Sequence, residues 1–371
     1  SNISGGAAFS MSDYNGGPID EAYVNRRLRN EPLVEITQAK GTSETHPFLS
    51  KNDEWAAFES KTNMPQENNI NNLKGSYVRD AYLRGLTLSE QGISNPFKFG
   101  VIGSSDTHVS GGSYTEETHF SKIGLLDGEP YLRGSVPYEG FYGFFTKLLR
   151  PEAIIEIDGN NYLGVSTRLI RFGSSGLAGV WAEENTRESI YDAFRRKETF
   201  GTSGPRIKVR FFAGYNLEGS KLGDLTLIQD AYAKNTPMGG TINQEEDKSP
   251  RFLVWAISDP LGAPLQRVQI IKGWLEGGEQ REKVFDVACS DGQSVDPVTH
   301  RCPDNGAMVN LDDCSISSDK GNSEIKTFWQ DPEFRQDQDA FYYSRILENP
   351  SCRWSTWDAV RDNEAPRSDI P

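Results

Sequence analysis

Residues 97–108 read FKFGVIGSSDTH, and this stretch decides how the first half of the chain is interpreted. The run from 97 to 103 predicts a compact buried strand, and the small residues that follow predict its end. Asp106 and His108 come next, where the loop after a strand lets two side chains turn toward one centre. A carboxylate and an imidazole together suit Zn, Mn or Fe. We therefore predict that Asp106 and His108 bind a metal; a capped turn with a surface histidine is the alternative.

A second pair of the same kind follows another apolar run. Residues 33–38 predict a buried strand, and Glu44 and His46 come after it across a short polar loop. The chain has only four histidines, and two of them stand in this setting. Polar residues at the ends of barrel strands are often catalytic. We predict that His46 is a metal ligand and that Glu44 is a catalytic base. The alternative is that Glu44 caps the loop while His46 packs on Pro47.

Helix and strand signals alternate through the first half of the chain. Asp20 is positioned to cap a helix through Arg29, residues 50–58 predict another helix, and a longer one begins at Ser76. Residues 177–182 predict a strand, and residues 185–188 form a capping box that opens a further helix. This alternation predicts an α/β unit over residues 1–205, either a parallel barrel or a doubly wound sheet.

The pattern changes near residue 205. From residue 206 onward, short apolar runs are separated by turn residues, and no helix is expected among them. We predict an all-β region over residues 206–371, built as a β-sandwich with loops between its strands. The expected strands cover residues 207–213, 222–228, 252–257, 268–275 and 283–287.

All four cysteines lie in the last quarter of the chain. Their even number and their clustering predict disulfides, and the absence of a C-x-x-C pattern makes a zinc site the weaker reading. Four cysteines allow three connectivities, which the sequence leaves open. Disulfides indicate a periplasmic or secreted protein. The cysteines are Cys289, Cys302, Cys314 and Cys352.

Charge and composition exclude some classes of partner. The 39 basic and 53 acidic residues give a formal net charge of −14, which repels phosphate backbones, so we expect no nucleic-acid partner. No apolar stretch reaches the roughly 18 residues that a membrane span requires. A small-molecule or ester substrate remains as the expected partner.

Other catalytic patterns are absent from the sequence. It contains no G-x-S-x-G elbow, no phosphate-binding G-x-x-x-x-G-K and no G-x-G-x-x-G that opens a helix. No cysteine occurs in the first half that could serve as a nucleophile there. Metal-activated water is the mechanism that the remaining residues support.

The chain resembles the family called domain of unknown function 3604. This family is similar to the PHP (polymerase and histidinol phosphatase) superfamily, whose members form a distorted (β/α) barrel with two or three metal ions. The matching stretches are residues 30–35, 41–47, 103–108, 181–187, 197–206 and 340–354.

The resemblance implies a metal-dependent hydrolase, in the first place a phosphoesterase, in which Asp106 and His108 match the last metal motif and His46 an earlier one. The opening H-x-H motif of the superfamily is not found here. We therefore expect that this chain resembles the C-terminal part of such an enzyme, and that a missing N-terminal part of the same protein supplies further ligands. A non-catalytic extracellular binding module, in which the β-sandwich recognises a polymer or partner, is the alternative.

Overall fold

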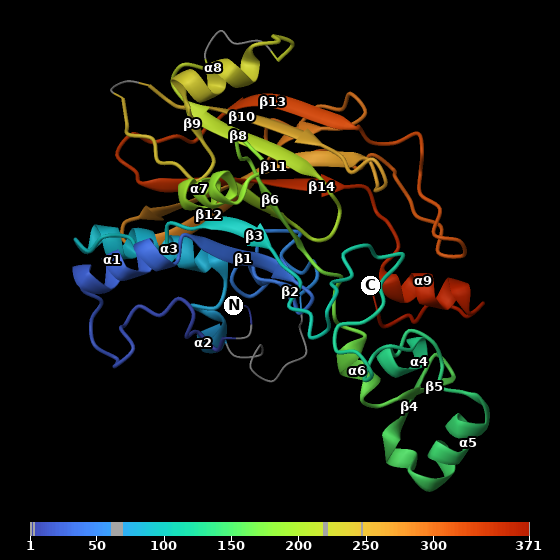
Figure 1. The fold of residues 1–371 in the computed structure, drawn as a ribbon. Helices are drawn as coiled ribbons and strands as arrows, with labels where there is room; N and C mark the ends of the chain where they lie inside the picture. Colours follow the sequence, from blue (N-terminus) through green and yellow to red (C-terminus); the bar gives the residue numbers. More distant parts are fainter. Residues whose placement is uncertain (1, 3, 61–69, 218–221, 246–247, 371) are drawn as a thin grey trace.

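The computed structural model describes residues 2, 4–60, 70–217, 222–245 and 248–370. It shows a mixed α/β half followed by a β-rich half, as the sequence predicts (Figure 1). No helix of the described residues is both long enough and apolar enough to pass through a membrane.

The first half is built on a small sheet with the strand order β2-β1-β3. β1 (Leu33–Gln38) runs parallel to β3 (Gly100–Gly103) and antiparallel to β2 (Gly41–Thr42). β1 has the predicted bounds. β3 is shorter than the strand predicted over residues 97–103, because Phe97 and Phe99 come before β3 and pack in the apolar core.

Helices connect and cover these strands. α1 (Glu21–Asn30) begins after Asp20, whose side chain accepts a hydrogen bond from the Tyr23 N–H, so the predicted cap is confirmed. After α2 (Ile70–Leu73), α3 (Val78–Glu90) crosses from β1 to β3. Helices and strands enclose an apolar core, as a βαβ unit requires. Its buried members are Phe9, Ile19, Val24, Val78, Ala81, Leu88, Phe97 and Phe99.

A two-stranded antiparallel sheet lies against β3. β6 (Leu177–Val180) pairs with β7 (Thr199–Thr202), and the predicted helix between them is α7 (Arg187–Arg196). Its N-cap is Thr186, one residue after Asn185, the first residue of the predicted capping box. The approach is close: a Cβ built on Gly103 would lie 2.6 Å from the carbonyl oxygens of β6 and β7. Glycine is therefore required where the strands meet.

The strands of the described residues do not form a closed barrel. Only β1 and β3 are parallel, and every other strand pair is antiparallel. In place of the expected partial (β/α) barrel, the structure has one parallel βαβ unit, with the antiparallel strand pair of β6 and β7 beside it.

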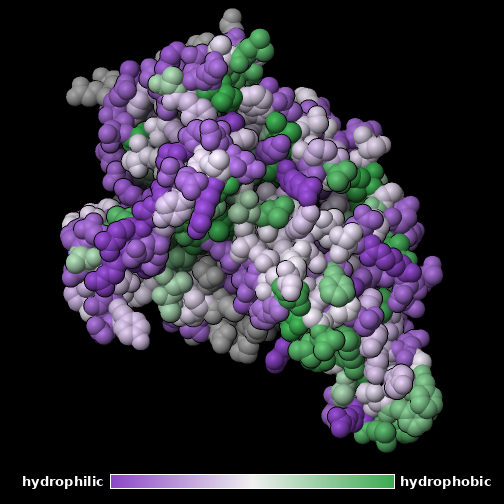
Figure 2. Space-filling model, in the orientation of Figure 1, coloured by the Kyte–Doolittle hydropathy of each residue, from purple (hydrophilic) through white to green (hydrophobic). Residues whose placement is uncertain are grey.

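An arm extends from the first half (Figure 1). α5 carries several exposed apolar side chains, among them Phe141 and Leu149, which are 72% and 74% exposed. Figure 2 shows hydrophobic residues gathered at the end of this arm. Its elements are α4 (Pro130–Arg133), α5 (Gly140–Leu149), η1 (Pro151–Ala153), β4 (Ile154–Ile157), β5 (Asn160–Leu163) and α6 (Ser166–Leu169).

Two antiparallel sheets form the β-rich half. One has the order β13-β10-β8-β9 and the other the order β12-β11-β14, and a shared apolar core contains side chains of both, as in a sandwich. The strands are β8 (Lys208–Gly214), β9 (Thr236–Pro237), β10 (Arg251–Ile257), β11 (Leu265–Glu276), β12 (Glu279–Cys289), β13 (Glu324–Gln330) and β14 (Ala340–Glu348).

One predicted strand of this half is wrong. Residues 222–228 do not form a strand, and α8 (Leu227–Lys234) begins within this range. Leu227 and Ala231 of α8 are buried against Phe212 of β8 and Leu253 of β10. The apolar residues of α8 therefore cover the outer face of one sheet, which a helix achieves as well as a strand.

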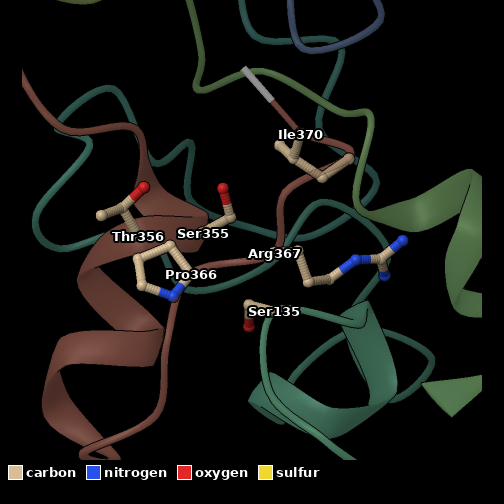
Figure 3. Close-up of a pocket in the computed structure, with 6 residues that line it drawn as sticks. All are labelled: Ser135, Ser355, Thr356, Pro366, Arg367 and Ile370. Carbon is tan, nitrogen blue, oxygen red and sulfur yellow. The ribbon is translucent and has the colours of Figure 1, made fainter. Parts of the chain in front are cut away.

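The C-terminal residues return to the first half of the chain. α9 (Trp354–Arg361) places Trp354 against His119, with ring centroids 4.6 Å apart, and its Asp358 pairs with Arg133 at 2.7 Å. Beyond α9, buried Arg367 donates to the Gly134 carbonyl, and a hollow of about 10 Å³ lies beside it (Figure 3).

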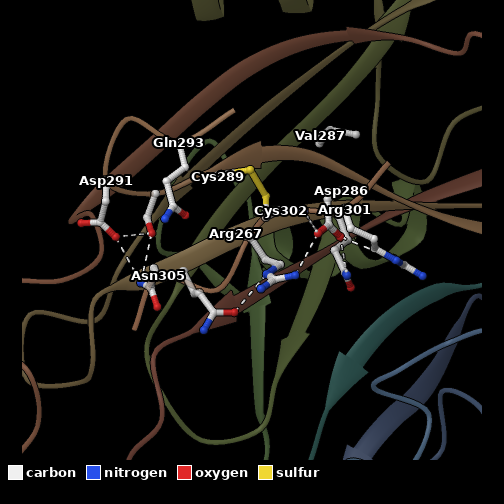
Figure 4. Close-up of a disulfide and its surroundings, with 12 residues drawn as sticks. Arg267, Asp286, Val287, Cys289, Asp291, Gln293, Arg301, Cys302 and Asn305 are labelled. Atoms are coloured by element: carbon white, nitrogen blue, oxygen red, sulfur yellow. Dashed lines mark hydrogen bonds and ion pairs between the residues drawn. A yellow bond between two sulfur atoms is a disulfide. The ribbon is translucent and has the colours of Figure 1, made fainter. Parts of the chain in front are cut away.

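Both predicted disulfides form. Cys289 bonds to Cys302 and Cys314 bonds to Cys352, which selects one of the three possible connectivities. The first bridge lies beside a buried ion pair between Arg267 and Asp286 (Figure 4).

Candidate functional site

The loops that follow β1 and β3 meet at one edge of the first sheet. The Ser104 N–H donates to the Thr37 carbonyl, and the Ala39 N–H donates to the Ser105 carbonyl. The carboxyl ends of parallel strands lie at the same edge, so residues that follow each strand are brought together. Asp106 is therefore close to Lys40, and the two side chains pair at 2.6 Å.

Asp106 has a left-handed backbone, with φ 48°. Aspartate is one of the few residues besides glycine that adopt this conformation readily. Burial raises the pKa of the Asp106 carboxyl, but the hydrogen bond from Lys40 and the charges of Lys122 and Lys40 lower it further, so the net pKa is below its ordinary value. Asp106 is consequently an anion at neutral pH.

A buried ammonium group lies between Asp106 and His108. Lys122 Nζ is 3.3 Å from Asp106 Oδ2, 2.7 Å from the Asp106 carbonyl oxygen and 3.2 Å from His108 Nε2. The Lys122 side chain is 1% exposed, while that of His108 is 55% exposed. Three acceptors thus converge on one positive centre, which is the arrangement that a cation site requires.

The pKa of Lys122 reflects this setting. Burial lowers the pKa of the ammonium group, and the nearby Asp106 carboxylate opposes the change without cancelling it. Lys122 therefore releases its proton more readily than an ordinary lysine.

His46 is buried, with 3% of its surface exposed, and its ring contacts Phe48 and Tyr77. Burial lowers the pKa of the imidazole, so the ring is neutral. Its Nδ1 accepts a hydrogen bond from the Phe48 N–H, which leaves the ring proton on Nε2. Nε2 is buried without a hydrogen-bond partner in the part of the chain that the structure describes. To bind a metal through Nε2, His46 would have to lose the Phe48 hydrogen bond.

Glu44 lies in a separate cluster of buried charges. Its carboxylate pairs with Arg79 at 2.6 Å and with Arg345 of β14 at 3.1 Å, and it accepts a hydrogen bond from Tyr343 at 2.7 Å. Burial raises the pKa of Glu44, but Arg345, Arg79 and Tyr343 together hold it below its ordinary value. A carboxylate with a lowered pKa is a weaker base, so these contacts favour a structural role for Glu44.

The structure brings some of the predicted residues together and not others. Asp106 and His108 lie side by side, with 3.9 Å between Asp106 Oδ1 and His108 Nε2. Over residues 2, 4–60, 70–217, 222–245 and 248–370, no three His, Cys, Asp or Glu side chains are grouped so that they could hold a metal ion. His46 as a third ligand and Glu44 as a base remain predictions.

Sequence reasoning missed the two lysines of this site. Lys40 stands two residues after β1, and its position opposite Asp106 follows from the parallel pairing of β1 with β3. Lys122 comes from a distant loop, and no pattern in the sequence indicates it. His119, the third histidine of the first half, is buried against Trp354, and burial together with Arg133 lowers its pKa to about 4.

Comparison with known proteins gives one match. A family model described as "Protein of unknown function (DUF3604)" matches residues 1–371. No curated protein and no solved structure is significantly similar to the chain.

Proposed function

Because the chain belongs to the DUF3604 family, for which no function is described, we propose from its own residues that it is a metal-dependent hydrolase, in the first place a phosphoesterase of the PHP type. One observation carries the proposal: Asp106 and His108 direct their lone pairs at a common positive centre, occupied by Lys122 Nζ. This centre lies at the carboxyl edge of a parallel strand pair, where α/β folds bind their ligands.

The donor set suits a divalent ion. Asp106 offers an anionic oxygen and His108 an imidazole nitrogen, the combination that Zn, Mn and Fe accept. When bound, such an ion supplies a water of lowered pKa for attack on an ester. Two side chains are too few to hold it, so the proposal requires further donors, and His46 after a ring rearrangement is the candidate in this chain.

The lysines have a defined role in this proposal. Lys40 and Lys122 are within ion-pair distance of Asp106, and once a metal shares the negative charge of Asp106 their ammonium groups are free to pair with an anionic substrate. A phosphoester presents oxygens that such donors bind, and negative charge that grows during hydrolysis is stabilised by them. This pairing favours phosphoesters over neutral esters.

A non-catalytic binding module is the second candidate. The observation that favours it is the charge balance at Asp106, whose carboxylate pairs with both Lys40 and Lys122. In that case the cluster is structural, and the sandwich carries the interaction. Under either proposal the two disulfides fit an oxidising compartment, and we place the protein in the periplasm or outside the cell.

Activity of the full-length protein tests the proposal. After loading with Zn²⁺ or Mn²⁺, we expect hydrolysis of bis(p-nitrophenyl) phosphate that is abolished by a chelator and lowered about 100-fold by Asp106→Asn or His108→Ala. His300→Asn is the matched control, because asparagine tolerates the left-handed backbone at this position, φ 54°, and activity should be unchanged. An inactive wild-type protein under every metal condition would refute the hydrolase.

A further inference from the structure

A hollow of about 580 Å³ lies between the arm and the end of α9. This volume falls within the range of roughly 300–1,000 Å³ that is typical of small-molecule sites. The hollow is distinct from the cluster around Asp106, since the two share no residue. Three tyrosines and three carboxylates give it its chemical character: Tyr131, Tyr138, Tyr142, Glu139, Asp362 and Glu364.

The tyrosines come from three parts of the arm. Tyr131 belongs to α4 and Tyr138 to the loop before α5, and their rings stack with centroids 5.4 Å apart and an interplanar angle of 20°. The Tyr138 N–H donates to the Asn161 carbonyl at 2.7 Å, which holds this loop against β5. Tyr142, on α5, is 76% exposed and is free to contact a ligand. The hollow therefore has an aromatic wall whose position is fixed by the backbone.

The carboxylates leave the hollow negatively charged. Glu139 comes from the residue before α5, and Asp362 and Glu364 follow α9. None of the three takes part in an ion pair with a basic side chain of the described residues, and no lysine or arginine lines the hollow. Two buried arginines of this region are paired elsewhere, Arg133 with Asp358 at 2.7 Å and Arg367 with Asp369 at 2.8 Å.

We propose that this hollow binds a small organic cation of the quaternary ammonium class. The faces of aromatic rings attract cations, and tyrosines grouped around a cavity are a known way of recognising methylated ammonium ions. Carboxylates that lack a basic partner also attract a cation, in addition to the aromatic rings. Sugars also stack on aromatic rings, but three unpaired carboxylates and no basic side chain favour a cation. The proposal does not depend on the hydrolase activity.

Calorimetric titration of the intact protein with choline tests the charge requirement. The matched probe is 3,3-dimethylbutan-1-ol, which has the shape of choline without its charge. We expect choline to bind, and the neutral alcohol to bind about tenfold more weakly or not at all. Equal binding of both compounds, or no binding of choline, would overturn the proposal. Binding of glucose in place of choline would overturn it in favour of a sugar site.

Variants locate the binding in the hollow. The double variant Asp362→Asn/Glu364→Gln should weaken choline about tenfold, and Tyr142→Leu should weaken it more than Tyr142→Phe, which keeps the ring. Tyr142 is exposed, so neither change disturbs the core. Glu184→Gln, an exposed carboxylate outside the hollow, should leave the affinity unchanged. If all variants bind choline like the wild type, the cation binds elsewhere and the assignment fails.

Discussion

Two clusters of acidic and basic side chains in this protein use similar residues and differ in how completely those residues are paired. Around Glu44 and Asp53, two arginines and Tyr343 occupy the carboxylate oxygens, and the cluster is buried between the first half of the chain and β14. Around Asp106, the cluster is open on one side, because the His108 side chain is 55% exposed.

This difference in pairing indicates which of the two clusters is suited to binding a ligand. A buried ion network with all its partners in place is costly to disturb, and it fixes the position of one part of a protein against another. A cluster of charged groups that is open on one side is suited to binding a ligand. We therefore assign a structural role to the Glu44 cluster and a ligand-binding role to the Asp106 cluster, and the predictions below test this contrast.

The largest effect is expected from Arg79→Met. The Arg79 side chain is fully buried and pairs with both Glu44 and Asp53, so its loss removes one of the two arginines that neutralise these carboxylates. The free energy of unfolding should fall by about 4 kcal/mol, measured by urea denaturation. Arg335→Gln, which breaks exposed ion pairs, should leave the free energy of unfolding almost unchanged. Equal losses in both variants would contradict the structural role.

Acid titration should reveal the Asp53 interaction. Burial raises the pKa of Asp53, but Arg345 and Arg79 hold it far below its ordinary value of 3.8. A carboxyl whose pKa is lowered in the folded state stabilises the protein above the unfolded pKa, and this contribution disappears as the pH falls. Asp53→Asn should therefore cost about 2–3 kcal/mol at neutral pH, and its difference from wild type should narrow between about pH 5 and about pH 2. A difference that is independent of pH would refute this.

Glu44→Gln separates a structural from a catalytic role. Glutamine keeps the shape but loses the charge that pairs with Arg79 and Arg345, so stability should fall by about 1–2 kcal/mol. The turnover number per folded molecule should stay within about twofold of wild type, as measured with bis(p-nitrophenyl) phosphate. A loss of about 100-fold in turnover without a loss of stability would show that Glu44 is the base that the sequence suggested.

A smaller effect on stability is expected from Lys122→Met than from the three variants of the Glu44 cluster. The methionine keeps most of the buried volume, and Asp106 retains its 2.6 Å pair with Lys40. The free energy of unfolding should change by less than about 1 kcal/mol. A loss as large as that of Arg79→Met would show that the Asp106 cluster is structural as well.

Local signals in the sequence predict part of this fold. β1 and the cap of α1 follow from short-range patterns, and the structure confirms them, while α7 forms where it is predicted with its cap one residue later. The helix expected over residues 50–58 is absent and these residues form turns. The reason is tertiary: Asp53, within this range, pairs with Arg79 and Arg345, which lie far from it in sequence.

The candidate site was predictable to the same degree. Asp106 and His108 are two residues apart after a strand, so their proximity follows from local geometry. The buried position of Lys122 and the ion pairs of Glu44 with β14 depend on long-range packing that no local pattern encodes. For this reason the sequence indicated Asp106 and His108 but not Lys122, which lies between them.

Titration of Zn²⁺ into the full-length protein tests the central claim, that Asp106 and His108 form a cation site. Lys122→Met removes the competing ammonium group, so we predict about tenfold tighter zinc binding than wild type, and about tenfold weaker binding for His108→Ala. His300→Asn should bind like the wild type. Zinc affinities that are the same in all four proteins, or no zinc binding in any of them, would contradict the claim.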